Sequence, residues 1–305
     1  MPQRDLDYVL RKLHWMEGER IWPNGLRYLW TDAFGLTLYV SLFRATADER
    51  WLERAKWLVA EVDRVLGRRR GYRIGEAADR DGQYFHYLAM WLYALACLGE
   101  HEHAYRDKGI RVAKDIHHSF VLPGRGVIWK MAEDLSAPYP GYGLGAMDAF
   151  DGYVSYKLLG EVELAAEIAD MRAIMEQQYE TLDVDQELGL GMMLWLAHVF
   201  PTEDWAVVQR EKSLAVLDRL WIDPPGYFGR ASYAPNMRIA FANYGVSIGL
   251  QSQDVWPERV AALNDYFERY RSGDEYDREA ITWVMACCSH FPGAFVNQPV
   301  EAEAG

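Results

Sequence analysis

Cysteine is scarce in this sequence, with three residues in a chain of 305. Cys97, Cys287 and Cys288 stand inside apolar helical patterns and form neither a CxxC pair nor a Cys/His array. We therefore expect reduced thiols in the core rather than disulfides or a zinc site. The sequence also has no phosphate-cradling glycine loop, HExxH or dinucleotide fingerprint. We expect neither a bound metal nor an organic cofactor.

Positive charge is also in short supply. Lys and Arg number 32 against 45 Asp and Glu, and the formal net charge is −13 with histidines neutral. Such a surface repels phosphate backbones and anionic lipids, which argues against nucleic acid and membrane partners. No apolar run approaches the roughly 18 residues of a membrane span, and the N-terminal segment MPQRDLDYVLRKLHW lacks the features of a signal peptide. We expect a soluble, cytoplasmic protein, and the sequence leaves its oligomeric state open.

Apolar and aromatic residues are plentiful, at 50% and 14% of the chain, which is enough for a sizeable core. Helical periodicity dominates, and strand alternation is confined to short pieces such as 127–131. The sequence therefore predicts an all-α protein. The predicted helices fall near 5–16, 30–45, 48–66, 84–99, 102–119, 148–160, 162–180, 190–200, 203–221, 240–252, 256–271 and 277–291.

These helices alternate in character. One set is nearly free of charge and must be buried on every side, as in YFHYLAMWLYALACLG, whereas the other is amphipathic, as in DERWLERAKWLVAEVDRVLG. The uncharged helices begin about 49 residues apart, the size of a helical hairpin plus a loop. We predict one domain over 1–305, with six inner and six outer helices in a closed double ring, residues 1–20 completing the outer ring and a flexible tail at 298–305. The long loops should gather on one face, at the N-termini of the inner helices.

This organisation, together with four segments, resembles the six-hairpin glycosidase superfamily over essentially the whole chain. The segments are DRDGQYFHYLAMWLYAL, WKMAEDLS, MDAFDGYVSY and MRIAFANYGVSIGLQ. The resemblance implies an (α/α)6 toroid that acts on a small-molecule or oligosaccharide substrate. Toroids of this kind also include sugar epimerases, polysaccharide lyases and terpenoid-processing enzymes, so fold alone does not specify the reaction.

Acidic residues are concentrated at or before the first turns of the inner helices. They are Asp32; Asp79 and Asp81; Asp148 and Asp151; Asp183, Asp185 and Glu187; and Asp274, Glu275 and Asp277. A role in capping a helix N-terminus explains any one of these acidic residues. Six inner helices, however, need fewer caps than there are acids here. Some of them are therefore expected to do chemistry.

Asp81 and Asp148 open consecutive inner helices, so a ring should place them across one opening as an acid and a base. A carboxyl separation of ~6.5 to 9.5 Å suits inverting hydrolysis and ~5 to 5.5 Å suits retention. The arrangement is similar to that of unsaturated glucuronyl hydrolases, a resemblance that implies catalytic roles for both. Asp151, one turn after Asp148, is a competing candidate, and His86 is a candidate proton carrier or hydroxyl donor.

Aromatic and polar residues near the same helix starts are candidates for binding the substrate, because aromatic rings stack on the apolar faces of sugars. They are Trp22, Tyr28, Trp30, Asp32, Gln83, Tyr84, Trp129, Lys130, Asp134, Tyr142, Arg238 and Asn243.

Three hypotheses follow from these residues. The first is a glycoside hydrolase-like enzyme that uses an Asp/Asp pair. The second is a sugar epimerase, isomerase or dehydratase in which His86 carries a proton. His198 and His290 lie near the C-terminal ends of their helices, away from the face where the other candidate residues gather. The third is a terpenoid-processing enzyme or a noncatalytic ligand-binding toroid.

Overall fold

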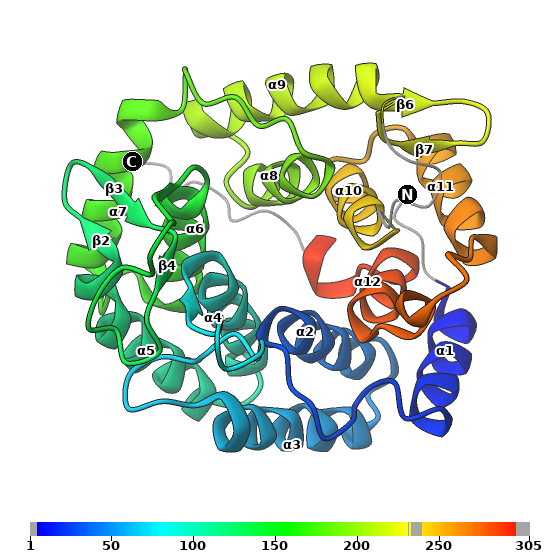
Figure 1. Cartoon of the computed structure of the whole chain (residues 1–305), viewed down its shortest axis with the longest axis horizontal. Helices are drawn as coiled ribbons and strands as arrows, with labels where there is room; N and C mark the ends of the chain where they lie inside the picture. The colour runs from blue at the N-terminus through cyan, green and yellow to red at the C-terminus, as the bar shows by residue number, and fades with distance from the viewer. Residues whose placement is uncertain (1–4, 231, 233–239, 297–305) are drawn as a thin grey trace. The chain divides into compact units, whose positions relative to one another are not determined.

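The computed structural model describes residues 5–230, 232 and 240–296. These residues form twelve α-helices joined by loops with a few very short strands (Figure 1). The chain divides into two compact units, which are described separately. The continuous unit is Gly25–Gln178, and the split unit combines Met1–Asn24 with Tyr179–Gly305.

The continuous unit consists of three helical hairpins. Its helices are α2 (Leu29–Thr46), α3 (Glu49–Leu66), α4 (Phe85–Gly99), α5 (His103–Phe120), α6 (Asp148–Gly160) and α7 (Ala165–Gln178). Helix α4 packs between α2 and α6, and each of these three contacts the amphipathic helix that follows it. Helices α2, α4 and α6 are buried along most of their length, whereas their partners carry exposed residues on one side.

The two kinds of helix follow from their sequences. Helix α4 contains no Asp, Glu, Lys or Arg, and it is buried continuously from Leu88 to Gly99. Helix α3 buries residues at positions three and four apart, from Leu52 to Leu66, and exposes charged residues between them. Apolar residues at this spacing form a single stripe, so α3 covers α2 with one face and leaves the other in water.

The split unit repeats this pattern. Its elements are α1 (Leu6–Gly18), α8 (Glu187–Val199), α9 (Asp204–Leu220), α10 (Ala240–Ser252), α11 (Pro257–Arg269), the 3₁₀ helix η1 (Glu275–Arg278), α12 (Ala280–His290) and the 3₁₀ helix η2 (Gly293–Val296). Helix α10 contacts α8, α11 and α12, and α1 packs on α12. Helices α8 and α10 approach so closely that a Cβ at Gly191 or Gly249 would overlap the backbone of the other helix.

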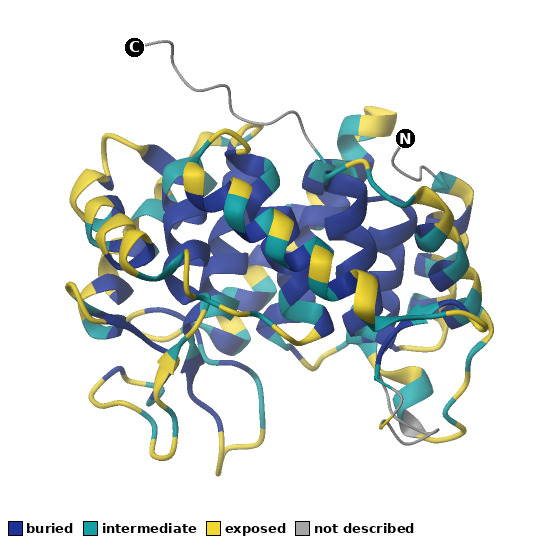
Figure 2. Cartoon of the chain, turned by 90° about the horizontal axis from the view of Figure 1, so that it is seen from above, coloured by how far each residue is buried: buried dark blue, intermediate teal, exposed yellow. Residues whose placement is uncertain are grey.

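Short antiparallel strands tie the long loops together. In the continuous unit, β1 (Gln83–Tyr84) pairs with β4 (Lys130–Met131), and β3 (Gly126–Ile128) lies between β2 (Val121–Leu122) and β5 (Leu144–Gly145). In the split unit, β6 (Trp221–Ile222) pairs with β7 (Tyr227–Phe228). The long loops of the continuous unit project from one end of its helices (Figure 2, lower left).

The twelve predicted helices are confirmed, with small shifts at their ends. The seventh begins at Ala165 rather than 162, the eighth at Glu187 rather than 190, and the twelfth at Ala280 rather than 277. The last shift arises because Asp274 accepts a hydrogen bond from the Tyr276 backbone and closes η1 ahead of α12. The predicted single domain stays a prediction, and residues 298–305 lie outside the described residues.

The three cysteines are buried, as expected. Burial raises the pKa of Cys97 to about 11, which keeps that thiol protonated at neutral pH. Among the described residues, no helix has both the length and the apolar character that crossing a membrane requires.

Candidate functional site

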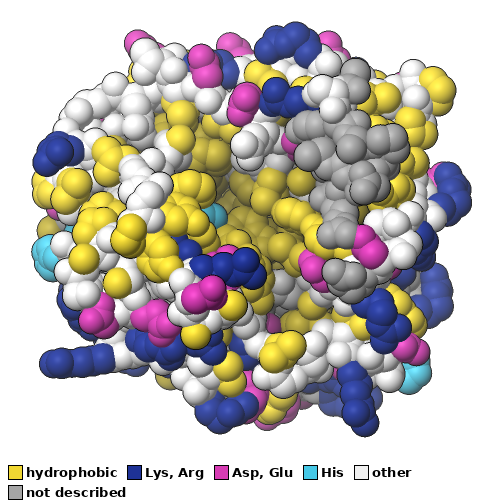
Figure 3. Space-filling model, in the orientation of Figure 1, with side chains coloured by type: hydrophobic (Ala, Val, Ile, Leu, Met, Phe, Trp, Pro, Cys, Tyr) yellow, Lys and Arg dark blue, Asp and Glu magenta, His cyan; other side chains and the backbone are white. Residues whose placement is uncertain are grey.

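An aromatic cluster in the continuous unit brings together residues from four segments. It consists of Trp30 on α2, Tyr84 and His86 at the start of α4, Trp129 between β3 and β4, and Tyr142 before β5. Ring centroids lie 5.9 Å apart for Trp30 and His86, 5.4 Å for Tyr84 and His86, and 5.3 Å for Trp129 and Tyr142. Trp129 is 41% exposed, so the cluster offers a ring face to solvent. Figure 3 shows hydrophobic side chains gathered over β4 and the beginning of α6.

Trp129 is held by hydrogen bonds on both sides of its peptide unit. Its N–H donates to the Gly143 carbonyl at 3.0 Å, and its carbonyl accepts from the Phe85 N–H at 3.1 Å. The second bond satisfies one of the free N–H groups at the start of α4. Its indole N–H donates to Nδ1 of His86 at 3.2 Å. Trp129 is thereby fixed against the first turn of α4.

His86 is half-buried among these rings. Burial lowers its pKa to about 3, because removing water penalises the charged imidazolium. The ring is therefore neutral at physiological pH. A neutral imidazole has one N–H donor and one acceptor nitrogen.

Asp148 and Asp151 occupy the first turn of α6 and are 4% and 8% exposed. Burial raises the pKa of Asp148 well above its ordinary value, and the nearby Asp151 carboxyl raises it further. Burial also raises the pKa of Asp151 to about 8. Oδ1 of Asp148 is buried without a hydrogen-bond partner among the described residues. Asp151 is therefore mainly protonated near pH 7, and the shift of the Asp148 pKa likewise favours its protonated form.

Gly145 leaves room for the Asp148 carboxyl. A Cβ at position 145 would overlap Oδ2 of Asp148. Gly145 is fixed in β5 by its pairing with Val127 of β3. The short strands therefore set the space in which the Asp148 carboxyl lies. Gly145 could not be identified from the sequence, because nothing local marks which residue faces this glycine.

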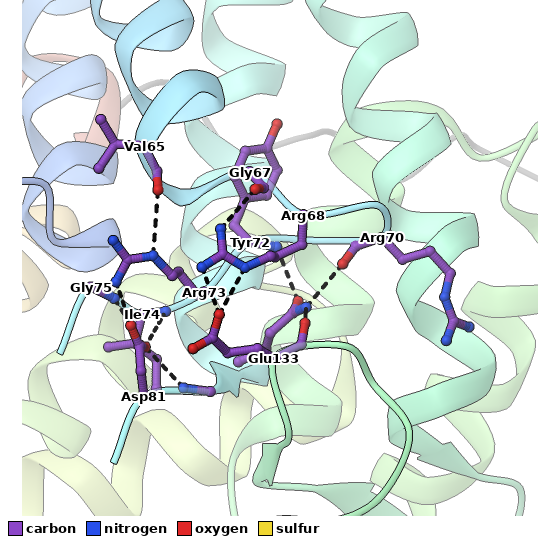
Figure 4. A network of polar contacts seen from close by, with 12 residues as sticks. Val65, Gly67, Arg68, Arg70, Tyr72, Arg73, Ile74, Gly75, Asp81 and Glu133 are labelled. Atoms are coloured by element: carbon purple, nitrogen blue, oxygen red, sulfur yellow. Dashed lines mark hydrogen bonds and ion pairs between the residues drawn. The ribbon is translucent and has the colours of Figure 1, made fainter. Parts of the chain in front are cut away.

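Asp81 is fully engaged by its own loop (Figure 4). Its Oδ2 lies 2.5 Å from Nη1 of Arg73, and its Oδ1 accepts backbone N–H groups of Ile74, Gly75 and Gly82 at 3.1, 3.2 and 2.9 Å. The side chain is 0% exposed. These contacts do not favour the acid/base role predicted for Asp81. They are those of a carboxylate that organises residues 73–82, and we assign it that role instead.

Three other predicted substrate-binding residues have their polar groups hydrogen-bonded within the protein. Lys130 is 1% exposed; its ammonium donates to the Arg80 carbonyl at 2.6 Å and lies 4.3 Å from the centre of the Tyr139 ring. Gln83 donates to the carbonyls of Arg70 and Glu133 and accepts from the Tyr72 N–H. These contacts make Lys130 and Gln83 parts of the loop scaffold. Asn243, in the split unit, bonds both backbone groups of Phe228.

Of the remaining candidates, Tyr28 contacts the aromatic cluster through Tyr87, whose ring lies 5.2 Å from that of Trp30. Tyr28 has its hydroxyl 2.5 Å from that of Tyr87. Asp32 is buried, with Oδ1 3.3 Å from Nη1 of Arg27. Asp134 is exposed and accepts from Ser136. Trp22 is buried in the split unit, and Arg238 lies outside the described residues.

Tyr87 and Tyr139 also belong to this region, although the sequence analysis did not single them out. The Tyr87 ring lies 4.6 Å from His86, and the Tyr139 ring lies 5.8 Å from Tyr142. Their proximity in sequence to His86 and Tyr142 was the only available signal. Among the described residues, no group of three or more His, Cys, Asp or Glu side chains is arranged to hold a metal ion.

No protein-family model matches the chain, and no curated protein sequence matches it. Solved structures do match. The chain is similar to a sugar epimerase from a ruminal bacterium, with 13% identity, 87% of each chain covered and a TM-score of 0.63. It is also similar to a GH76 α-mannanase from Bacteroides thetaiotaomicron, with 11% identity, 89% of this chain and 88% of the other covered, and a TM-score of 0.64.

A third similar structure is cellobiose 2-epimerase from Bacillus thermoamylovorans, with 10% identity, 87% of each chain covered and a TM-score of 0.62. At such identities the likeness establishes the fold and not the reaction. The chain therefore has the all-α (α/α)6 fold that its sequence predicted.

Proposed function

We propose that this chain is a carbohydrate-active enzyme in which Asp148 and Asp151 transfer protons beside a sugar-stacking aromatic cluster. The observation that carries the proposal is the buried carboxyl pair at the start of α6, where Asp148 lies against the backbone N–H of His86 in the aromatic cluster. General acids that work near neutral pH need raised pKa values. The direction of the Asp148 shift meets that requirement.

The reaction that this pair suits best is glycoside hydrolysis. Asp148 donates its proton to the glycosidic oxygen as the bond from that oxygen to the anomeric carbon breaks. Ionised Asp151 accepts a proton from the water that attacks this carbon. Because the pKa of Asp151 is raised to about 8, turnover should increase with pH up to about 8.

A carbohydrate substrate is supported by the rings beside the pair. Trp129 exposes part of its face, and Tyr142 meets it at an interplanar angle of 67°. Flat aromatic surfaces of this kind stack on the apolar faces of sugar rings. The similar structures include a mannanase and two sugar epimerases. Their fold and this surface support the same class of substrate.

The test is an activity screen against oligosaccharides and aryl glycosides. With a substrate in hand, Asp148→Asn should lower kcat about 10² to 10⁴-fold while the circular dichroism spectrum is unchanged. Asp151→Asn should do the same. Asp115, an exposed residue of α5, provides the matched control, and Asp115→Asn should keep full activity. Unchanged turnover in both site variants would refute the proposal.

A second candidate is a sugar epimerase or isomerase in which His86 carries a proton. It is supported by the neutral imidazole beside the cluster and by the similarity to two epimerases. Solvent deuterium in the recovered sugar would distinguish it from hydrolysis, which releases new reducing ends without exchange at carbon. Ligand-induced thermal stabilisation without any product would indicate a binding protein instead.

A further inference from the structure

We propose that Trp129 is a positioning residue that holds the imidazole of His86 in the tautomer with its proton on Nε2, so that His86 presents a hydrogen-bond donor to a sugar oxygen. The identity of the acceptor rests on the proposed function. The tautomer itself depends only on contacts within the protein.

The first step is the direction of the Trp129–His86 hydrogen bond. An indole nitrogen can donate but cannot accept. Trp129 Nε1 lies 3.2 Å from His86 Nδ1, so Nδ1 must be the acceptor and cannot carry a proton. Because a neutral imidazole has one N–H, its proton is on Nε2.

The second step is that Trp129 cannot easily move away. Its backbone is bonded to Gly143 on one side and to Phe85 on the other. Phe85 and His86 are the first two residues of α4. The residue that fixes the ring of His86 therefore also bonds the helix that carries it.

The third step concerns Nε2. None of the residues 5–230, 232 and 240–296 accepts a hydrogen bond from this atom. Among the tyrosines whose rings contact His86, the Tyr87 hydroxyl bonds to that of Tyr28, and the Tyr84 hydroxyl bonds to that of Tyr142. An acceptor for the Nε2 proton must therefore come from a bound molecule or from water. Sugar hydroxyl and ring oxygens accept such a bond.

This assignment gives His86 a specific role. With its proton on Nε2, the ring donates to the substrate and cannot act as a base through that nitrogen. In hydrolysis it would orient a hydroxyl. In epimerisation, a group other than Nε2 of His86, such as the ionised Asp151, would have to remove the first proton.

The experiment is nitrogen NMR of protein labelled with ¹⁵N-histidine at pH 7.5, without substrate, with His86→Gln used to assign the signal. We expect a protonated Nε2 and an unprotonated Nδ1 in the wild type. Trp129→Phe keeps an aromatic face but removes the N–H, so both nitrogens should then show averaged shifts of mixed tautomers. Trp57→Phe replaces an exposed tryptophan of α3 and should leave the His86 signals unchanged.

A proton on Nδ1 in the wild type, or an unchanged spectrum in Trp129→Phe, would overturn the inference. Because no substrate is present, neither result depends on the proposed enzyme activity. Once a substrate is known, Trp129→Phe should lower kcat/KM about tenfold, as expected for the loss of one oriented hydrogen bond.

Discussion

At the scale of single residues, two opposing effects set the protonation state of Asp148. The backbone N–H groups of Asp148 and His86 favour the ionised carboxylate, as does the start of a helix. Burial and the neighbouring Asp151 carboxyl favour the neutral acid, and burial is the larger effect. Two acids are thus kept protonated where water would ionise them, which is unfavourable for stability at high pH and useful for proton transfer.

The raised pKa of Asp151 predicts a pH dependence of stability. An aspartate in the unfolded chain releases its proton near pH 3.8, whereas the native Asp151 keeps its proton up to about pH 8. Between these values the native state binds more protons, so its free energy of unfolding should fall as pH rises, by at most about 1.4 kcal/mol per pH unit. Urea unfolding at pH 5 and pH 8 should show a smaller difference in Asp151→Asn than in the wild type. Equal differences would contradict the assignment.

Gly145 allows a test of where the Asp148 carboxyl lies. A methyl group at this position would overlap Oδ2, so Gly145→Ala should displace the carboxyl and lower kcat at least about tenfold. A Cβ at Gly143 would meet nothing within 4 Å, and Gly143→Ala is the matched control with near-normal activity. Comparable activity of the two variants would show that Asp148 does not need its present position.

At the scale of elements, the loop before α4 depends on one carboxylate. Asp81 joins Arg73 to three backbone N–H groups and has no exposed surface. A carboxylate with this many donors acts as a local organiser, because each buried donor left unpaired costs about 1 to 3 kcal/mol. The loop leads into β1, which pairs with β4 just after Trp129. Order in this loop therefore extends to the aromatic cluster.

We expect Asp81→Asn to destabilise the protein by about 3 kcal/mol, because the amide cannot replace the charge opposite Arg73. Amide hydrogen exchange should accelerate at residues 72–84. Asp79 is exposed, and Asp79→Asn should show neither effect. If Asp81→Asn kept full stability and lost all turnover, the acid/base pair of Asp81 and Asp148 predicted from the sequence would be favoured instead.

At the scale of the whole molecule, buried histidines change the stability with pH in the direction opposite to that of the carboxyl pair. Burial lowers the pKa of His86 to about 3 and that of His290 to about 4, and it also lowers that of His117. A histidine in the unfolded chain takes up its proton near pH 6.5. Below that pH the unfolded state binds more protons at these positions, so acid should reduce stability.

The two opposing effects can be separated. In the double variant Asp148→Asn, Asp151→Asn, the stabilisation that the carboxyl pair gains on acidification is absent. Its free energy of unfolding should therefore fall more steeply than that of the wild type between pH 7 and pH 5, measured by urea unfolding of the full chain. A double variant whose stability does not change over this range would show that the histidines are not kept neutral by burial.

The sequence by itself determined the helices and their division into buried and amphipathic sets. Both depend on the spacing of apolar residues within a single segment, and α4 and α3 carry that information locally. It also indicated Asp148 and Asp151 at the start of α6 and the aromatic residues around them. Tertiary structure decided which polar side chains are already hydrogen-bonded within the protein. Asp81 and Gln83 lie just before the start of α4, as Asp148 lies at the start of α6, and Lys130 lies in β4. No local pattern distinguishes these polar residues. Their roles depend on the donors and acceptors that folding brings within hydrogen-bonding distance. Those of Asp81 come from its own loop, whereas Lys130 and Gln83 also bond residues about 50 positions away.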